Sequence, residues 1–394
     1  MDFPRLLYIG DVPVESSYHG SALLYRLLQD YPLEKLCIVE TNLARSLPER
    51  RLSGVTYAEL PFGHPRLLFT RFARDYRAWL TWRAAGRFRR LPRLLSGFKP
   101  QAVLTVTHGF AWCTAARFAA EKNLPLHLIC HDDLPRLEDL PAVWLGWRDR
   151  EFQRAYRQAA SRLCVSPFMR DAYRERYGIL GEVLYPSRAA DCEEYTSPPE
   201  RLRETRLALT GVYAGSINSE GYARAVRQLA QSLAEIRGRL LLFGPLRPEE
   251  IRNRGLDLPN VVTCGLVSFQ ELIDRCRKEA DFLYVPMSFD AHDRSNMELS
   301  FPSKLTDYTA VGLPLLIRGP DYCSAIRWAK DNPNVAEFID TEESFALLSA
   351  LRRLGENSQH RFQLAARALE LGGKLFSHAT IRQTFLTALS QRLN

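Results

Sequence analysis

Residues 298–318 read E-L-S-F-P-S-K-L-T-D-Y-T-A-V-G-L-P-L-L-I-R. Pro302 predicts the start of a helix, because its φ is preset for a first turn and its missing N–H is not needed there. Gly312 and Pro314 predict the end of that helix, and the apolar run after them is typical of a buried strand. A helix that leads directly into such a strand indicates β-α-β architecture.

The start of this helix is a candidate anion site. The backbone N–H groups of Ser303, Lys304 and Leu305 have no helical partners, and the positive end of the helix dipole lies beside them. The Lys304 ammonium would add a charge, and Asp307, one turn later, is placed to accept the hydroxyls of a ribose. The alternatives are a solvated Lys304 and a surface ion pair for Asp307.

Outward from this stretch, short apolar runs alternate with helical patterns, which predicts a mostly parallel sheet in each half of the chain. In the first half, we expect strands near 5–10, 36–40, 55–60, 102–107, 126–130 and 162–166, and helices near 20–30, 67–95, 111–122, 145–160 and 167–177. In the second half, we expect strands near 211–215, 239–243, 261–264, 281–285 and 313–317, and helices near 220–236, 247–254, 269–279, 302–311 and 321–331.

The repeated pattern predicts two domains. A proline-rich and charged stretch at 186–205 favours a boundary near Ser187, which gives domains over 1–187 and 188–374. The tail reads as helix from about Gln359 to Leu393, and we expect its last part, 375–394, to pack back on the first domain. The fold class is therefore α/β, with two facing Rossmann-like domains and a ligand cleft between them.

The composition fits a cytoplasmic globular protein. Of the 394 residues, 46% are apolar and 25% are charged. The eight cysteines are scattered singly, which predicts free thiols in a reducing compartment. The N-terminus shows no secretion-signal pattern, and no apolar run approaches the roughly 20 residues that cross a bilayer.

Residues 302–314 also carry a family resemblance. They match the pattern P-x-K-x-x-E-Y-x-A-x-G-x-P at Pro302, Lys304, Asp307, Tyr308, Ala310, Gly312 and Pro314. The segments V-V-T-C-G-L-V-S-F-Q-E-L, A-D-F-L-Y-V-P-M and V-S-P-F-M-R-D-A-Y-R-E-R-Y-G extend the match to most of 100–320. The chain resembles the GT-B glycosyltransferases of the family 4-like group.

The resemblance implies a hexosyltransferase that moves a sugar from a nucleotide diphosphate donor, without a cofactor or a metal and with retention of configuration. The acceptor would be a saccharide, a lipid-linked molecule or a protein, in bacterial surface polysaccharide or glycoconjugate synthesis. The second domain would bind the donor and the first the acceptor. The alternatives are a nucleotide-sugar epimerase of the same fold and a catalytically silent scaffold of a polysaccharide assembly complex.

The chain departs from the family pattern at the donor site. Leu299 stands where many members have a first glutamate, with Glu298 one position away, and Asp307 replaces the second. The loop A-G-S-I-N-S-E-G lacks the usual Arg and Lys, so we expect it to approach the phosphates through Gly215, Ser216 and Asn218. The cation must then come from Lys304, from Arg294 in the preceding loop, or from Arg188.

In the first domain, the resemblance points to two strand-to-helix loops. His131 would hydrogen-bond the donor sugar and Asp132 would deprotonate or orient the acceptor hydroxyl, although Asp132 or Asp133 would equally suit a turn cap. His108 is a weaker candidate of the same kind. His19 and Gly20 occupy the place of a glycine-rich loop that approaches the phosphate or the acceptor, and a plain helix cap is the alternative.

Residues 66–99 hold ten Lys or Arg and one acid, Asp75, so their net +9 exceeds the +8 of the whole chain. Aromatic residues at 69, 72, 76 and 79 are spaced to share one helical face beside arginines, which is typical of helices on anionic membranes. The alternative is a face that packs on the sheet. We expect a peripheral membrane contact here.

Several other classes are excluded. The sequence has no G-x-G-x-x-G, no P-loop and no cluster of metal ligands, which argues against dehydrogenases, kinases and metalloenzymes. Nucleic-acid binding is not expected, because the rest of the chain is close to neutral and carries no known binding module.

Overall fold

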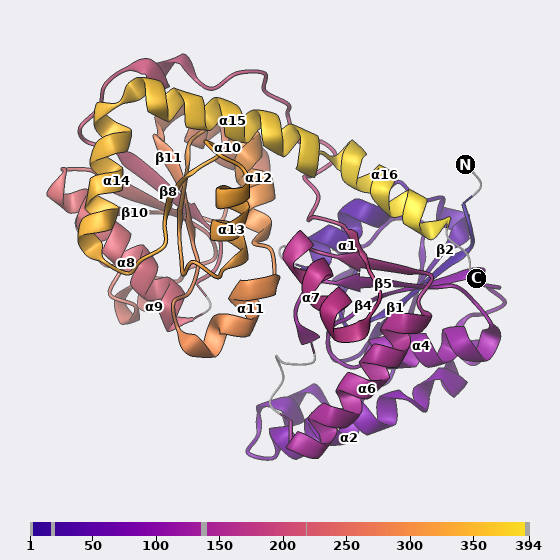
Figure 1. The fold of residues 1–394 in the computed structure, drawn as a ribbon. Coiled ribbons are helices and arrows are strands. Elements are labelled where there is room, and N and C mark those ends of the chain that lie inside the picture. The colour runs from indigo at the N-terminus through magenta and orange to yellow at the C-terminus, as the bar shows by residue number, and fades with distance from the viewer. Residues whose placement is uncertain (1–2, 17–19, 135–139, 218, 391–394) are drawn as a thin grey trace. The chain divides into compact units, whose positions relative to one another are not determined.

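The computed structural model describes residues 3–16, 20–134, 140–217 and 219–390, and all structural statements concern these residues. They form two compact units (Figure 1). Unit 1 runs to Ser187 and resumes at His378, while unit 2 is Arg188–Ser377. The sequence placed the boundary near Ser187 and the return of the tail near residue 375.

Unit 1 is built on a seven-stranded parallel sheet with the order β3-β2-β1-β4-β5-β6-β7. The strands are β1 (Leu6–Gly10), β2 (Leu36–Thr41), β3 (Thr56–Leu60), β4 (Ala102–Val106), β5 (Leu126–Cys130), β6 (Ser161–Cys164) and β7 (Glu182–Val183). The helices are α1 (Gly20–Leu28), α2 (Ala73–Ala84), α3 (Leu91–Leu94), α4 (Ala111–Lys122), α6 (Ala142–Gln158), α7 (Pro167–Tyr177) and α16 (His378–Leu389).

Unit 2 is built on a six-stranded parallel sheet with the order β10-β9-β8-β11-β12-β13. The strands are β8 (Thr210–Ala214), β9 (Arg239–Phe243), β10 (Val261–Gly265), β11 (Phe282–Pro286), β12 (Leu315–Arg318) and β13 (Glu337–Ile339). The helices are α8 (Glu220–Glu235), α9 (Pro248–Asn253), α10 (Phe269–Glu279), α11 (Arg294–Leu299), α12 (Ser303–Val311), α13 (Ser324–Asp331), α14 (Ser344–Glu356) and α15 (Ser358–Phe376).

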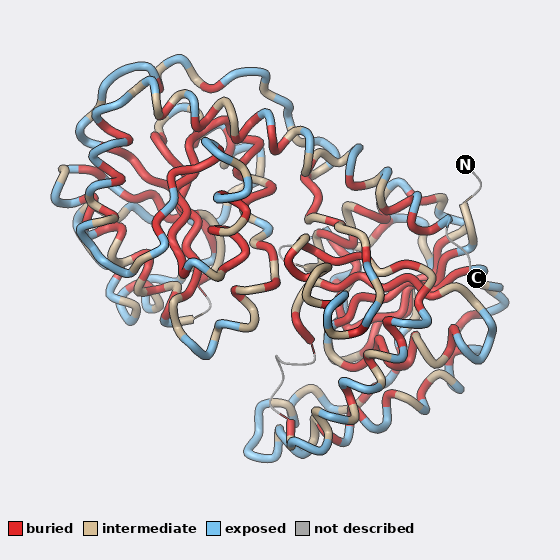
Figure 2. The backbone as a smooth tube through the Cα atoms, viewed as in Figure 1, coloured by how far each residue is buried: buried red, intermediate tan, exposed pale blue. Residues whose placement is uncertain are grey.

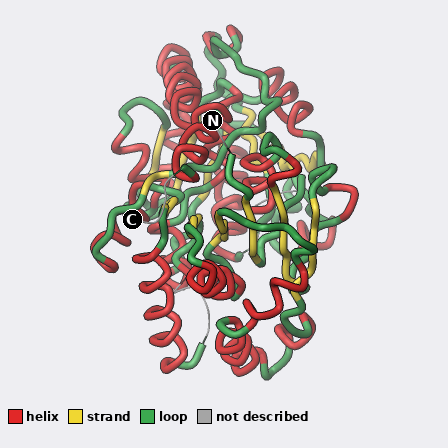
Figure 3. The backbone as a smooth tube through the Cα atoms, turned by 90° about the vertical axis from the view of Figure 1, so that its right-hand side faces the viewer, coloured by secondary structure: helices red, strands yellow, loops and turns green. Residues whose placement is uncertain are grey.

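The central strands are buried because helices cover the sheets. Figure 3 shows the strands among the helices, and Figure 2 shows buried backbone along them. All residues of β1, β4, β5 and β11 are buried, which matches their nearly continuous apolar sequences. Both sheets reverse their strand order once, between β1 and β4 and between β8 and β11, and ligands of such sheets bind beyond the carboxyl ends at this switch point.

The predicted helix over 67–95 is wrong, because the segment is broken into four short pieces. A 3-10 turn at Pro65–Phe69 precedes α2, and a second 3-10 turn at Arg87–Arg90 leads into α3. Gly86 precedes the second turn, where a residue of low helix propensity ends the regular helix. The aromatic residues at 69, 72, 76 and 79 therefore do not lie on one continuous helix.

The predicted helix from Gln359 to Leu393 is also divided. Ser377, with an extended ψ of 146°, separates α15 from α16. Ile381, Phe385 and Leu389 of α16 belong to the hydrophobic core of unit 1, where α16 lies beside α1 (Figure 1). The division between the two helices therefore coincides with the passage of the chain from unit 2 to unit 1.

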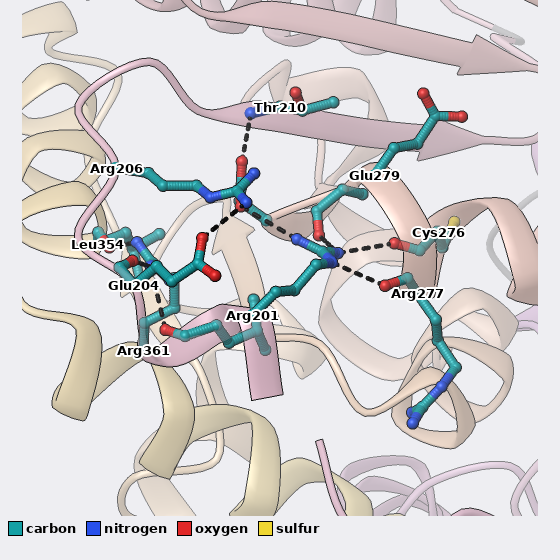
Figure 4. A network of polar contacts seen from close by, with 12 residues as sticks. Arg201, Glu204, Arg206, Thr210, Cys276, Arg277, Glu279, Leu354 and Arg361 are labelled. Carbon is teal, nitrogen blue, oxygen red and sulfur yellow. Dashed lines mark hydrogen bonds and ion pairs between the residues drawn. The ribbon is translucent and has the colours of Figure 1, made fainter. Parts of the chain in front are cut away.

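Two arginines, the half-buried Arg201 and the buried Arg361, attach the start of unit 2 to its own core (Figure 4). Arg201 donates to the carbonyl oxygens of Arg277, Cys276 and Ala280, and it pairs with Asp281 at 3.3 Å. Arg361 of α15 donates to the carbonyl oxygens of Leu202, Glu204 and Leu354. These bonds satisfy backbone carbonyls in a stretch with little regular structure of its own.

The position of α16 predicts a local effect on stability. Phe385→Ala should lower the free energy of unfolding of unit 1 by about 3–5 kcal/mol, because it leaves a cavity in a fully buried site. Hydrogen exchange read by mass spectrometry in mild denaturant should show faster exchange in β1 and α1. The exposed Thr387→Ala on the same helix is the control, and unchanged exchange in unit 1 for Phe385→Ala would contradict this packing.

Candidate functional site

Two glycines, Gly215 and Gly244, allow close packing at the carboxyl end of β8 because they have no side chain. Gly215 has a φ of +129°, a conformation that residues with a Cβ rarely adopt. A Cβ at Gly215 would stand 2.7 Å from Cε of Lys304, and a Cβ at Gly244 would stand 2.6 Å from the carbonyl oxygen of Gly215. The absence of a side chain at Gly215 therefore allows the side chain of Lys304 to lie over the switch point of unit 2.

Lys304 presents a cation at this strand end. Its ammonium lies 4.9 Å from the centre of the Tyr213 ring, an arrangement that stabilises a cation. The side chain is half-buried, and burial lowers the pKa of Lys304 to about 8. No carboxylate among the described residues forms an ion pair with it. An anion at this point would restore the full charge on the ammonium.

The start of α12 differs in detail from the prediction. Pro302 is the N-cap, and the helix begins at Ser303. The N–H group of Leu305 is not free, because it donates to the carbonyl oxygen of Pro302 at 3.0 Å. The N–H groups of Ser303 and Lys304 make no hydrogen bond to any described residue. Two backbone donors, rather than three, are thus available to an anion.

Tyr308 holds α12 against β8. Its hydroxyl accepts a hydrogen bond from the N–H of Ala214 at 2.7 Å and lies 3.3 Å from the carbonyl oxygen of the same residue. Tyr213 donates to the carbonyl oxygen of Ser216 at 2.6 Å and so shapes the following loop. The sequence analysis did not include these two tyrosines in the site, although Tyr308 is part of the family pattern itself.

Asp307 lies on the same helix, half-buried, one turn after Lys304. The third predicted cation, Arg188, is buried and donates to the carbonyl oxygen of Thr306 at 3.2 Å and to Oγ1 of Thr309 at 3.0 Å. Burial lowers the pKa of Arg188, and the charge of Asp307 opposes this shift. Arg188 therefore supports α12 from within, and the prediction of a phosphate-binding role for it is wrong.

Arg294 begins α11 rather than lying in a loop, and it is exposed. Its guanidinium lies 4.4 Å from the centre of the Tyr322 ring. Glu298 is half-buried on the same helix. Burial raises the pKa of Tyr322, and the charge of Arg294 opposes this shift. The predicted residue Asn218 lies outside the described residues.

In unit 1, His131 follows β5 and lies beside Gly20. A Cβ on Gly20 would stand 4.0 Å from Nδ1 of His131. The Nε2 atom of His131 is buried and has no hydrogen-bond partner among the described residues. Burial lowers the pKa of His131 to about 4, against the opposing charge of Asp132. The imidazole is therefore neutral at pH 7. His19 lies outside the described residues.

The two neighbouring aspartates have different surroundings. Asp132 is half-buried, and its carboxylate lies 3.9 Å from Nδ1 of His108, which is itself more than half exposed. Asp133 is buried and pairs with Arg176 at 2.6 Å, which fixes it as a structural group. The structure thus brings together Gly20 and His131, and Asp132 and His108, at the carboxyl ends of β4 and β5.

Asp11 is a structural residue that the sequence analysis missed. Its buried carboxylate follows β1 and accepts hydrogen bonds from the N–H groups of Phe110 and Ala111, at 2.5 and 2.7 Å, and from the Thr41 hydroxyl. It therefore occupies the N-terminus of α4 at the switch point of unit 1. A lone aspartate after an apolar strand gives no clear sequence signal for this role.

No three His, Cys, Asp or Glu side chains in the described part of the chain are grouped so that they could hold a metal ion.

Residues 41–186 match the family model described as Glycosyltransferase Family 4. No curated protein sequence matches the chain.

Solved structures with the same fold cover nearly the whole chain. HepE of Anabaena, in complex with UDP, has a TM-score of 0.69 at 15% identity, over 98% of this chain and 99% of that one. The sucrose-phosphate synthase of Thermosynechococcus elongatus has a TM-score of 0.63 at 13% identity, over 96% and 97%. The α,α-trehalose 6-phosphate synthase of Burkholderia multivorans has a TM-score of 0.64 at 13% identity, over 98% and 96%.

The predicted fold class is confirmed by these structures, and the family resemblance is confirmed by the family model and the structures together. The chain therefore has the GT-B fold, and its residues 41–186 carry the signature of glycosyltransferase family 4.

Proposed function

We propose that this protein is a glycosyltransferase that takes a sugar from a nucleoside diphosphate donor held by unit 2. The observation that carries the proposal is Lys304, a half-buried cation over Gly215 at the switch point of the sheet. The free N–H groups of Ser303 and Lys304 add two donors for a diphosphate. HepE of Anabaena, whose fold is similar, was solved with UDP and with UDP-glucose, which makes UDP the first probe.

The other donor contacts follow from the positions along α12 and α11. Asp307 accepts the ribose hydroxyls, the loop at Gly215 and Ser216 approaches the phosphates, and Arg294 and Glu298 contact the sugar side of the donor. Pro302 fixes where α12 begins. The ammonium and the two N–H groups neutralise the leaving diphosphate, so the proposed transfer needs no metal and no cofactor. Retention of configuration is proposed from the family resemblance.

Unit 1 supplies the acceptor groups. His131, neutral at pH 7, hydrogen-bonds a sugar hydroxyl through its imidazole, and Gly20 lies beside the ring. Asp132 orients or deprotonates the acceptor hydroxyl, a role worth roughly 10²–10⁴-fold in rate. The acceptor is a saccharide, lipid-linked molecule or protein of surface polysaccharide or glycoconjugate synthesis.

The donor site is tested by comparing two ligands. Lys304→Met should weaken UDP binding in calorimetry about ten- to a hundredfold and leave uridine binding unchanged, because Lys304 contacts only the diphosphate. Lys330→Met, which removes an exposed lysine paired with Asp340, is the matched control. Equal losses for UDP and uridine would rule out the phosphate contact.

The same variant gives a pH signature. A bound diphosphate favours the charged lysine, so the pKa of Lys304 must be higher in the complex than its value of about 8 in the free protein. UDP affinity should thus be level below pH 8 and fall by up to about tenfold per pH unit above it. Lys304→Met should show no such fall.

The groups of unit 1 should act on turnover rather than on donor binding. Asp132→Asn should lower kcat about a hundredfold or more at nearly unchanged UDP affinity, as expected for a group that acts during transfer. His131→Ala should lower kcat in the same assay of UDP release with acceptor. Asp75→Asn, an exposed aspartate of α2, is the control. Full turnover in both variants would place the catalytic group elsewhere.

The exposed apolar residues of 66–99 support a further part of the proposal, peripheral contact with an anionic membrane. No helix in the described ranges is long and apolar enough to cross a bilayer. We use the name aromatic patch for the exposed rings of Phe69, Phe72, Trp79 and Trp82, with Phe69 at 88% and Trp82 at 59%. The exposed Arg71 and Arg83 stack on Phe72 and Trp79, and each exposed arginine is worth about 1 kcal/mol near anionic lipid. A bilayer surface would accept both kinds of side chain.

Flotation with liposomes tests this contact. Phe69→Ser combined with Phe72→Ser should abolish most binding to vesicles with anionic lipid at low salt, because both rings would leave water on contact. Phe345→Ser removes a ring that is 70% exposed on α14 of unit 2, and it should bind like the wild type. A wild-type protein that stays in the soluble fraction would overturn the membrane proposal.

A further inference from the structure

Unit 1 contains a cavity of about 470 Å³ that takes no part in the proposed donor and acceptor sites. Five of its lining residues are arginines, and they define what we call the arginine cavity: Arg83, Arg87, Arg89, Arg90 and Arg117. The remaining lining residues are Trp82, Ala85, Gly86 and Phe88, so no acid contributes to the wall. The cavity shares no lining residue with the donor or acceptor groups.

Four of the five arginines of the cavity form no ion pair within the described residues. The fifth, Arg117, pairs with Glu151 at 2.5 Å. Burial, together with the charges of Arg83 and Arg90, lowers the pKa of Arg87 to about 10. The like charges therefore repel one another in the free protein, and an anion in the cavity would remove this cost.

The wall of the cavity is fixed in place. Arg87 is buried, donates to the carbonyl oxygens of Pro61 and Phe62, and lies 4.2 Å from the centre of the Phe62 ring. Its Nε is buried without a partner among the described residues. Arg87 is thus a structural residue of the cavity and, because it is buried, is not among the arginines of 66–99 that could contact a membrane.

The opposite wall is joined to the first. Thr114 of α4 donates to the carbonyl oxygen of Ala84 at the end of α2, at 2.8 Å. Arg117 lies one helical turn after Thr114, so the bond that joins the two helices also sets the position of Arg117. Because these bonds fix the wall before a ligand arrives, binding does not have to order the cavity, which favours affinity.

We propose that the arginine cavity binds a phosphomonoester or diphosphate group that belongs to an amphiphilic molecule. Three guanidinium groups without an ion pair, those of Arg83, Arg89 and Arg90, suit a ligand with at least two negative charges, and the fork of a guanidinium matches two phosphate oxygens. A carboxylate would leave most of these donors without an acceptor.

The amphiphilic part of the proposal follows from the border of the cavity. Trp82 lines the cavity and also belongs to the aromatic patch. Arg83 lines the cavity and stacks on Trp79 of the same patch, 4.7 Å from the ring centre. A ligand with its phosphate among the arginines would therefore place an attached apolar chain on exposed aromatic rings.

The test separates the phosphate site from the donor site and from general attraction to a membrane. It uses the full chain with Lys304→Met, so that pyrophosphate cannot bind through Lys304. Arg89→Gln combined with Arg90→Gln removes two exposed arginines of the cavity, and Arg66→Gln combined with Arg93→Gln removes two exposed arginines outside it. Both double variants lose the same charge, and circular dichroism checks that both are folded.

Two measurements follow. In calorimetry, inorganic pyrophosphate should bind about tenfold or more weakly to the cavity variant and nearly normally to the control variant. The flotation assay compares phosphatidylcholine vesicles that contain either phosphatidic acid or phosphatidylglycerol, matched to the same zeta potential. The vesicles with phosphatidic acid should bind more protein. Only the cavity variant should lose this preference.

If the two double variants weaken pyrophosphate binding equally, the arginine cavity is not the phosphate site. A pyrophosphate effect without any preference for phosphatidic acid would identify a free phosphate compound as the ligand and overturn the amphiphile. Both measurements use protein without Lys304 and compare variants or vesicles of equal charge. The transferase proposal can therefore fail while the arginine cavity is supported, and the reverse is equally true.

Discussion

Parallel pairing throughout both sheets obliges every strand to return through a crossover, so the carboxyl ends of all strands meet along one edge of each sheet. This constraint decides where reactive side chains can gather. The two units use the switch point differently. In unit 1, the Asp11 carboxylate fills it and caps α4. In unit 2, Gly215 has no side chain, and the end of the Lys304 side chain occupies the space beside it.

Burial then sets the charge state of the groups at these edges. It acts in the same direction on Lys304 and His131, because a positive charge is disfavoured in both places. The consequences differ. Lys304, with a pKa of about 8, keeps most of its charge at pH 7 and gains the rest when an anion arrives, whereas His131 remains a neutral donor or acceptor. In the proposed donor site, one lysine with two backbone donors takes over the task that an Arg and a Lys share in the family pattern.

The sequence was most informative where the pattern is regular. Central strands of five or six apolar residues and the helix α12 were predictable, whereas β7 and β13, with two and three residues, are too short to produce a periodic signal. Breaks inside helical patterns were missed at Gly86 and Ser377, because the flanking residues continue the helical spacing. Composition also could not show which arginines are buried. Arg87 is buried and donates to backbone carbonyls while the nearby Arg89 and Arg90 are exposed, and Arg188 is buried and donates to residues of α12.

The return of α16 to unit 1 has a consequence for the order in which the protein is made. In the linear chain, all of unit 2 is inserted between the two parts of unit 1. The residues of α1 that α16 contacts remain uncovered until α16 has left the ribosome, although they are made before all of unit 2. Unit 2 is complete before that moment. The unit encoded second can therefore fold first, and unit 1 closes its core only after unit 2 has been made.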